Sequence, residues 1–181
     1  MKVMQIEGAW GTGNIRLADR PEPQPGPGEV VIGIEAVSIN PRDRVMAEGG
    51  YGRRGGALPL VPLCDGAGRV VSLGEGVDGF SIGERVIPAY SRTWLSGTFQ
   101  STSFAGAHGG PLDGMMQERI AIPAAALVRA PAHLSAEEAA TLPCAAVTAW
   151  NALVAQGKLR PRQSVLLQGT GGVSLFALQI A

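Results

Sequence analysis

SVLLQGTGGVSLFALQIA, residues 164–181, joins a short apolar run to a glycine-rich turn and then to an amphipathic segment. The apolar run predicts a buried strand, bounded by the turn. Apolar residues after the turn recur at the spacing of one helix face, namely Val173, Phe176, Ala177 and Ile180. A glycine turn between a strand and a helix directs backbone N–H groups and the positive end of the helix dipole toward a bound anion. The stretch therefore predicts the start of an α/β domain with a dinucleotide site.

The turn itself departs from the usual G-x-G-x-x-G pattern at one position. Ser174 stands where a third glycine would allow close packing of helix on strand, and serine is a small substitute. A plain turn before a helix is the structural alternative. A phosphate-binding loop of the NTPase type is excluded, because no Lys-Ser or Lys-Thr pair follows the glycines. The predicted cofactor contacts of the turn are Gly169, Thr170, Gly171, Gly172, Val173 and Ser174.

The residue composition limits the classes of binding partner that the chain is expected to have. The 181 residues carry 15 basic and 15 acidic side chains, for a net charge of zero, with 45% hydrophobic and 17% charged residues. Such a chain is expected to be soluble and globular, with room for one domain and part of a second. A balanced charge gives no electrostatic reason to bind nucleic acid or an anionic membrane, so neither partner is expected.

Cysteine usage and the first residues point to a cytoplasmic protein. The chain has two cysteines, Cys64 and Cys144, and its opening residues lack the apolar core of a signal peptide. Polar residues, glycine or proline interrupt every run well short of the roughly 18 apolar residues of a membrane span. In a reducing compartment a disulfide between the two cysteines is not expected.

Short strands separated by turns dominate the first 130 residues. Their spacing is typical of a β barrel or sandwich. A Pro/Gly-rich linker at 21–28 and a Ser/Thr/Gly-rich surface loop at 88–114 interrupt the pattern. The predicted strands are Val3–Ile6, 29–39, Gly68–Leu73, Arg85–Ile87, Met115–Ile122 and Leu127–Arg129.

Helices follow from residue 135. Ser135 and Glu138 form a capping box, Pro143 is expected to end or kink the first helix, and a second helix at 147–156 stops before Gly157. The predicted organisation is a β-rich domain over 1–130, linking helices over 131–160, and the first strand, glycine turn and helix of an α/β domain over 161–181.

Five segments in order carry a resemblance that covers essentially the whole chain. They are Ser38–Asp43, Pro62–Val70, Gly76–Val86, Ala139–Trp150 and Gly169–Val173. With these segments the chain resembles the medium-chain dehydrogenase/reductase superfamily. The resemblance implies a mainly β GroES-like catalytic domain followed by the start of an α/β Rossmann domain, with hydride transfer between them. Full members are nearly twice as long, so the chain is expected to be truncated after the first Rossmann βα element and to have little activity alone.

The resemblance also bears on zinc. Zinc-binding members place Cys, His followed by Glu, and Cys at the positions of Asn40, Cys64 with Asp65, and Cys144. This sequence keeps only the last, so zinc is not expected and the two cysteines are interpreted as small buried side chains. The alternative is a zinc-dependent alcohol dehydrogenase that uses Cys64, Asp65 and Cys144, because two thiolates and a carboxylate can hold zinc with one position open.

Without zinc, the resemblance implies an NAD(P)H-dependent oxidoreductase of the quinone or enone reductase type. The expected catalytic residues are Asn40, Tyr51, Cys64 and Asp65, with Thr148 near the nicotinamide. The cofactor is NAD(P), with NADP slightly favoured, the substrate a small carbonyl, quinone or alcohol, and the assembly a homo-oligomer. A non-catalytic GroES-like interaction module is the alternative outside enzymes.

The remaining cationic and titratable side chains are expected at the surface. His108 and His133 have no partner in the local sequence, and Arg42, Arg53 and Arg54 are expected to be solvated. Asp43 is expected to form a turn or to orient its neighbours.

Overall fold

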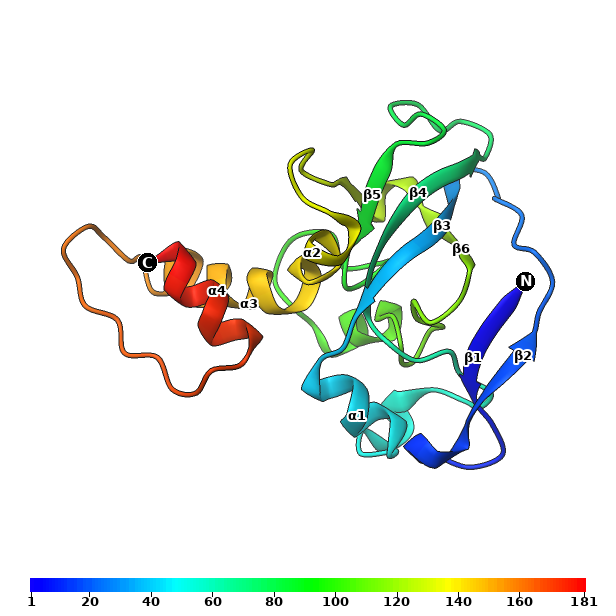
Figure 1. Ribbon diagram of the computed structural model, residues 1–181, viewed down its shortest axis with the longest axis horizontal. Coiled ribbons are helices and arrows are strands. Elements are labelled where there is room, and N and C mark those ends of the chain that lie inside the picture. The colour runs from blue at the N-terminus through cyan, green and yellow to red at the C-terminus, as the bar shows by residue number, and fades with distance from the viewer.

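The computed structural model describes residues 1–181, apart from the side chains of Arg53 and Arg54. A curled antiparallel sheet of five strands, ordered β6-β3-β4-β5-β7, forms its centre (Figure 1). The strands of this sheet are β3 (Glu29–Ser38), β4 (Asp65–Leu73), β5 (Arg85–Pro88), β6 (Arg119–Pro123) and β7 (Leu127–Arg129). A second, two-stranded sheet pairs β1 (Lys2–Ile6) with β2 (Ile15–Asp19). Six predicted strands are thus confirmed, although the strand predicted to start at Met115 begins at Arg119, and β2 was not predicted.

The main core lies on the sheet around β3, the longest strand. β3 pairs with β4 and β6, and its register with β4 shifts twice, which lets the sheet curl. Val30, Val31 and Ile32 are all buried, and because successive side chains point to opposite faces, β3 is covered on both faces here. The buried cluster comprises Val30, Ile32, Val70, Val86, Met115, Ile120, Ile122, Ala126 and Leu127.

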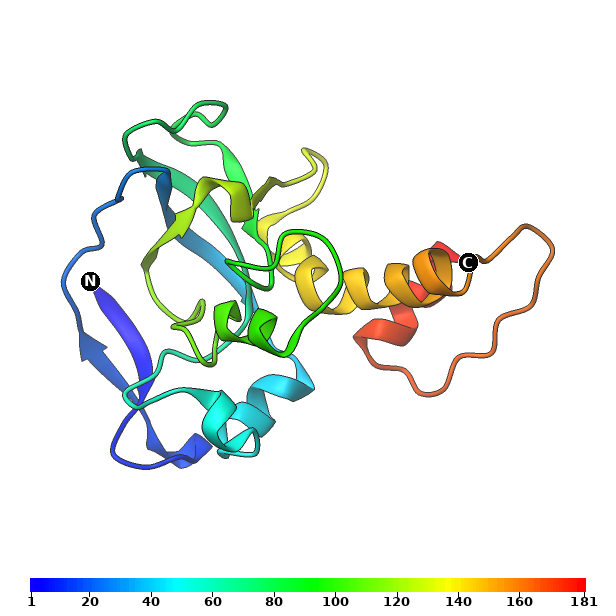
Figure 2. The same ribbon diagram turned by 180° about the vertical axis from the view of Figure 1, so that it is seen from behind.

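The helices connect the strands or follow the last of them. They are α1 (Pro41–Ala47), α2 (Ala136–Ala140), α3 (Val147–Trp150) and α4 (Gly172–Ile180), with π-helical segments at Leu142–Ala146 and Asn151–Gln156 and short 3₁₀ helices at Thr12–Asn14, Gly52–Gly55, Ser101–Gly106 and Ala124–Ala126. Figure 2 shows α2, the π segments and α3 running away from the sheet as one rod, with α4 beside it. No helix of the described residues is long and apolar enough to cross a membrane.

The rod begins with the predicted capping box and changes pitch at the predicted proline. Ser135 Oγ accepts from the Glu138 amide at 3.2 Å, and Glu138 accepts from the Ser135 amide at 2.8 Å. Pro143 has no N–H to donate, and the turn that contains it is a π turn rather than a break. α4 packs on this turn and on α3, with Ala177 buried.

The predicted strand at 164–168 is not formed. These residues are extended and pair with no strand of the described chain, and Leu166 is 87% exposed. A parallel strand exists only where neighbouring strands accept and donate its backbone hydrogen bonds, and the segment swings out as a loop between the rod and α4 (Figure 1). The apolar run alone therefore does not make a strand.

Candidate functional site

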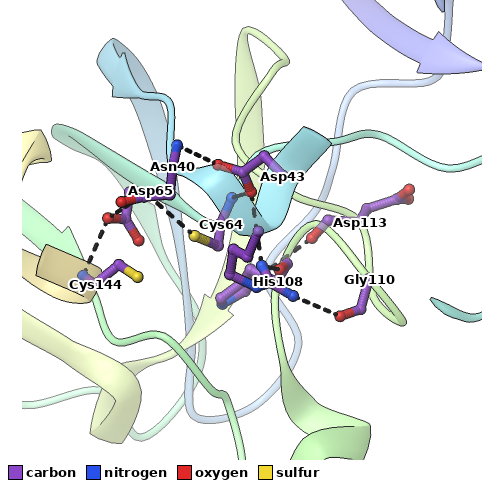
Figure 3. Close-up of polar contacts among 9 residues, drawn as sticks. Asn40, Asp43, Cys64, Asp65, His108, Gly110, Asp113 and Cys144 are labelled. Atoms are coloured by element: carbon purple, nitrogen blue, oxygen red, sulfur yellow. Dashed lines mark hydrogen bonds and ion pairs between the residues drawn. The ribbon is translucent and has the colours of Figure 1, made fainter. Parts of the chain in front are cut away.

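The candidate site begins at the junction between β3 and α1. Asn40 is the N-cap residue, in an extended conformation, and Pro41 takes the first helical position, where a missing N–H costs nothing. Asp43 then accepts two backbone hydrogen bonds: Oδ2 from the Asn40 amide at 2.7 Å and Oδ1 from the Cys64 amide at 3.1 Å (Figure 3). The buried Asp43 carboxylate therefore orients its neighbours, which is the less common of its two expected roles.

Asp65 is the centre of a second group of contacts. Its Oδ2 accepts from Asn40 Nδ2 and from the Cys144 amide, each at 3.0 Å, and Asn40 Nδ2 also lies 3.6 Å from Cys64 Sγ (Figure 3). The other oxygen, Asp65 Oδ1, is buried without a hydrogen-bond partner among the described side chains and backbone. The ligand atoms of Cys64, Asp65 and Cys144 all lie within 4.8 Å of one another. Asn40, Cys64, Asp65 and Cys144 are thus brought together.

Burial and mutual hydrogen bonding set the protonation of this group. Burial raises the pKa of Asp65, against the hydrogen bonds that it accepts. The hydrogen bond between the two thiols, followed by burial, raises the pKa of Cys64, while the same hydrogen bond lowers the pKa of Cys144. Cys144 is also the more exposed of the two thiols. Cys144 is therefore the sulfur that ionises first.

Arg42 lies inside the molecule, which corrects the expectation that it is solvated. Its side chain is 10% exposed and donates to the carbonyl oxygens of His108 at 3.0 Å and Gly110 at 3.3 Å. The guanidinium carbon lies 4.9 Å from the ring centre of Tyr90 and 6.0 Å from that of Tyr51. Arg42 therefore fastens the 88–114 loop to α1. The side chains of Arg53 and Arg54 lie outside the described residues.

His108 is buried, which corrects the expectation of a surface histidine; His133 is exposed, as expected. His108 Nδ1 lies 3.2 Å from the Asp113 carbonyl oxygen, and Nε2 has no partner within the described part of the chain. Burial lowers the pKa of His108 to about 4, so the ring is neutral at pH 7 and Nδ1 carries the proton toward Asp113. Residues 106–110 of the 88–114 loop are thus packed inside, whereas the middle of the loop, 93–102, is exposed.

A cavity of about 490 Å³ lies between the α1 end of the sheet and the glycine turn. Among the predicted site residues it is lined by Asn40, Gly171, Gly172, Val173 and Ser174. Its other walls are Ser38, Ile39, Pro41, Thr141, Ala145, Gln168, Leu175, Phe176 and Gln179. Gly169, Thr170, Cys64 and Asp65 lie outside this lining.

Two more predicted residues lie away from the cavity. Thr148 is exposed on the rod, one helical turn beyond the lining residue Ala145. Tyr51 stacks on Phe104 of the 88–114 loop, with ring centres 5.7 Å apart. Tyr90, which the sequence did not single out, lies closer to Arg42 than Tyr51 does. Two phenol rings therefore lie beside Arg42, which the sequence did not predict.

The glycines of the turn have distinct roles. Gly169 has φ +82°, a conformation that favours glycine, and a Cβ on Gly171 would meet nothing within 4 Å. A Cβ on Gly172 would lie 3.3 Å from Ala145 Cβ, so this glycine allows α4 to approach the rod. Ser174 Oγ donates to the Gln168 carbonyl oxygen at 3.0 Å, which closes the turn. Open space at Gly171, the N-cap of α4, leaves room for an anion.

Known proteins resemble this chain over its whole length. The family model described as alcohol dehydrogenase GroES-like domain matches residues 26–132. A zinc-type alcohol dehydrogenase-like protein of Schizosaccharomyces pombe is 46% identical over 86% of this chain and 45% of its own. A synaptic vesicle membrane protein VAT-1 homolog of Rattus norvegicus is 33% identical over 99% of this chain and 40% of its own. The chloroplastic quinone-oxidoreductase QR1 of Triphysaria versicolor is 30% identical over 100% of this chain and 52% of its own.

A solved structure agrees with the sequence relatives. The crystal structure of a putative alcohol dehydrogenase from Sinorhizobium meliloti 1021 superposes with a TM-score of 0.91 at 40% identity, over 99% of this chain and 53% of that one. The chain thus spans about half the length of the relatives that it matches. Through its GroES-like domain, the chain belongs to the medium-chain dehydrogenase/reductase superfamily of oxidoreductases.

Proposed function

We propose that this chain supplies the catalytic domain and the phosphate-binding turn of an NAD(P)H-dependent oxidoreductase that reduces quinones or activated carbon–carbon double bonds without a metal. One observation carries the proposal: a single cavity is lined by Asn40 on one side and by Gly171–Ser174 on the other. The names of relatives agree, since they include a quinone-oxidoreductase and an acryloyl-coenzyme A reductase.

The residues of the cavity fit a dinucleotide. Gly171 leaves open space at the N-terminus of α4, where unpaired N–H groups and the helix dipole favour a pyrophosphate. Bound NAD(P)H would supply a hydride to the substrate. Asn40 would form the wall beside the reacting atoms, with its backbone fixed by Asp43 and its side chain fixed by Asp65. In this proposal Tyr51 and Cys64 are catalytic residues and Thr148 contacts the nicotinamide, as predicted for them.

The proposal divides the chain into a catalytic domain over 1–130, linking helices over 131–160 and the first part of a Rossmann domain over 161–181. It also includes a cytoplasmic homo-oligomer that acts on a small carbonyl, quinone or alcohol. Because 164–168 has no sheet neighbours among the described residues, we expect the 181 residues alone to bind the cofactor weakly and to show little or no turnover. Turnover by this chain alone at the rate of an ordinary reductase would contradict that expectation.

A titration tests the cofactor proposal. The chain is titrated with NADPH and with NADH while nicotinamide fluorescence is followed, and NADPH is expected to bind slightly more tightly. Gly171→Val places a side chain in the open space of the turn and should weaken binding at least about tenfold, or about 1.4 kcal/mol. Gly13→Val is the matched control, because a Cβ there also meets nothing within 4 Å, far from the cavity. Equal affinities of both variants, or no fluorescence change, would refute the proposal.

A zinc-dependent alcohol dehydrogenase is the second candidate, because the thiols of Cys64 and Cys144 and the unpartnered Asp65 Oδ1 form a donor set that fits zinc. Zinc held there would polarise a carbonyl or alcohol oxygen. The zinc-free proposal is favoured because the fourth neighbour, Asn40, directs N–H groups at the cluster rather than a ligand atom. Stoichiometric zinc in purified protein, lost in Cys144→Ala, would decide for the second candidate.

A further inference from the structure

We propose that Cys64 and Cys144 are a redox modification site, at which a hydroperoxide converts the two thiols into a reversible disulfide. The proposal needs only the two sulfur atoms and is independent of cofactor binding. The two residues lie 80 positions apart in the sequence and meet where β4 begins and the rod passes the sheet.

The geometry brings the sulfurs within reach of each other. Their Sγ atoms lie no more than 4.8 Å apart, and a disulfide requires about 2.05 Å. Rotation about the Cα–Cβ bonds moves a sulfur atom by a comparable distance. Cys144 also belongs to the π-helical turn Leu142–Ala146, whose backbone departs from regular α geometry. The pair can therefore be bridged with a small local adjustment.

The two thiols differ in access, as an attacking and a resolving cysteine do. Cys144 is half-buried, so a small oxidant reaches it, whereas Cys64 is fully buried behind it. Asn40 Nδ2, 3.6 Å from Cys64 Sγ, holds the inner sulfur beside its partner. An oxidant would convert a single exposed cysteine further to sulfinic acid. Here a second thiol lies next to the oxidised one and can form a disulfide with it instead.

The reaction balances with hydrogen peroxide as the oxidant. Cys144 Sγ attacks one peroxide oxygen, the O–O bond breaks, and a sulfenic acid and one water form. Cys64 Sγ then attacks Cys144 Sγ, the S–O bond breaks, and a second water leaves with the remaining thiol proton. Two thiols are oxidised to one disulfide, and one peroxide is reduced to two waters.

The bond would tie the rod to the sheet beside the cavity. Thr141 precedes the π turn and Ala145 lies within it, and both line the cavity together with Asn40. A Cys64–Cys144 disulfide would hold these walls at a fixed separation. It would also close a long loop in the unfolded chain, so the oxidised protein should unfold at higher denaturant concentration than the reduced protein.

Peptide mapping tests the proposal. The 181-residue chain, freed of metal with a chelator, is treated with hydrogen peroxide at a small molar excess, alkylated and analysed by mass spectrometry. The expected result is a loss of two hydrogens per chain, protection of both cysteines from alkylation, a crosslinked Cys64–Cys144 peptide, and full reversal by dithiothreitol. Accumulation of sulfinic acid at Cys144 with Cys64 still alkylated would overturn the proposal, as would crosslinks only between chains.

Two variants and one condition serve as controls. Cys64→Ser should stop at the sulfenic acid of Cys144, which dimedone traps, and Cys144→Ser should leave Cys64 reduced at the same peroxide dose. Crosslinking of the native chain should be at least about tenfold faster than in denaturing urea, because folding holds the sulfurs together. Equal rates in urea would also overturn the proposal. Since the native chain carries the decisive measurement, a variant that fails to fold does not affect the outcome.

Discussion

At the scale of single residues, buried charges hold the site together. Arg42 and Asp43 are neighbours on α1, yet their side chains form hydrogen bonds to different segments of the chain. Asp43 accepts from the backbones of Asn40 and Cys64, while Arg42 donates to the carbonyl oxygens of His108 and Gly110. Because each charge is paired and hydrogen-bonded, its burial is tolerated. These two side chains therefore join the end of β3, the start of β4 and the 88–114 loop.

Replacing Arg42 by lysine should weaken this junction. Lysine keeps the positive charge but cannot donate to two carbonyl oxygens in the planar geometry of a guanidinium, nor stack on Tyr90 in the same way. We expect Arg42→Lys to lower the free energy of unfolding by about 2 kcal/mol, the net value of two hydrogen bonds. Urea denaturation measures this loss. Arg44→Lys, on the exposed side of the same helix, should change little; equal losses in both variants would argue against the junction.

His108 should give the protein a distinct pH dependence. The pKa of His108 is about 4 in the folded chain and about 6.5 when unfolded, so the unfolded chain binds more protons between these values. Stability should therefore be complete near pH 7 and fall by about 3 kcal/mol as the pH drops toward 4. Denaturation curves across this range test the effect.

A comparison of variants assigns this pH dependence. His108→Asn keeps an N–H for the Asp113 carbonyl but has no titrating ring, so it should lose most of the decline between pH 6.5 and 4.5. His133→Asn, at the exposed second histidine, should keep the decline. A decline that survives in His108→Asn would show that other groups cause it.

At the scale of elements, the rod and α4 place the glycine turn against the sheet domain. The approach of α4 depends on Gly172, which leaves 3.3 Å between a hypothetical Cβ and Ala145 Cβ. Gly172→Val should push α4 away from the π turn and increase hydrogen exchange of the α4 amides at least about tenfold, because a branched side chain cannot fit there. Gly171→Val, one residue earlier and facing open space, should leave this exchange unchanged. Equal protection in both variants would contradict the packing.

The elements also show what the sequence could predict. Alternation and turn residues predicted six strands, and the Ser135–Glu138 capping box marked the start of the rod. α1 was missed because it has only seven residues and follows directly from a strand. The prediction of a strand at 164–168 was wrong, because a strand forms only beside neighbouring strands, which an apolar run does not specify.

The candidate site, like the elements, could be predicted only in part from the sequence. Asn40, Cys64, Asp65 and Cys144 could be placed together from the resemblance, and the structure brings them together. The burial of Arg42 and His108 could not be predicted, because it arises from the 88–114 loop folding back over α1. The small residues around His108, in Ala107-His108-Gly109-Gly110, were the available signal of close packing.

At the scale of the whole molecule, two halves face each other across one cavity. The sheet domain contributes Ser38–Pro41, the rod contributes Thr141 and Ala145, and the glycine turn with α4 contributes the opposite wall. Figure 2 shows how far the rod carries α4 from the body of the sheet. The central claim of the proposed function is that both walls hold the same dinucleotide.

Chemical-shift mapping by NMR tests this claim most directly. In the isotope-labelled 181-residue chain, addition of NADPH should shift the backbone amides of Gly171–Ser174 and the side-chain amide of Asn40 together, with one common dissociation constant. Shifts confined to one wall, separate constants for the two walls, or no shifts at millimolar NADPH would contradict the account.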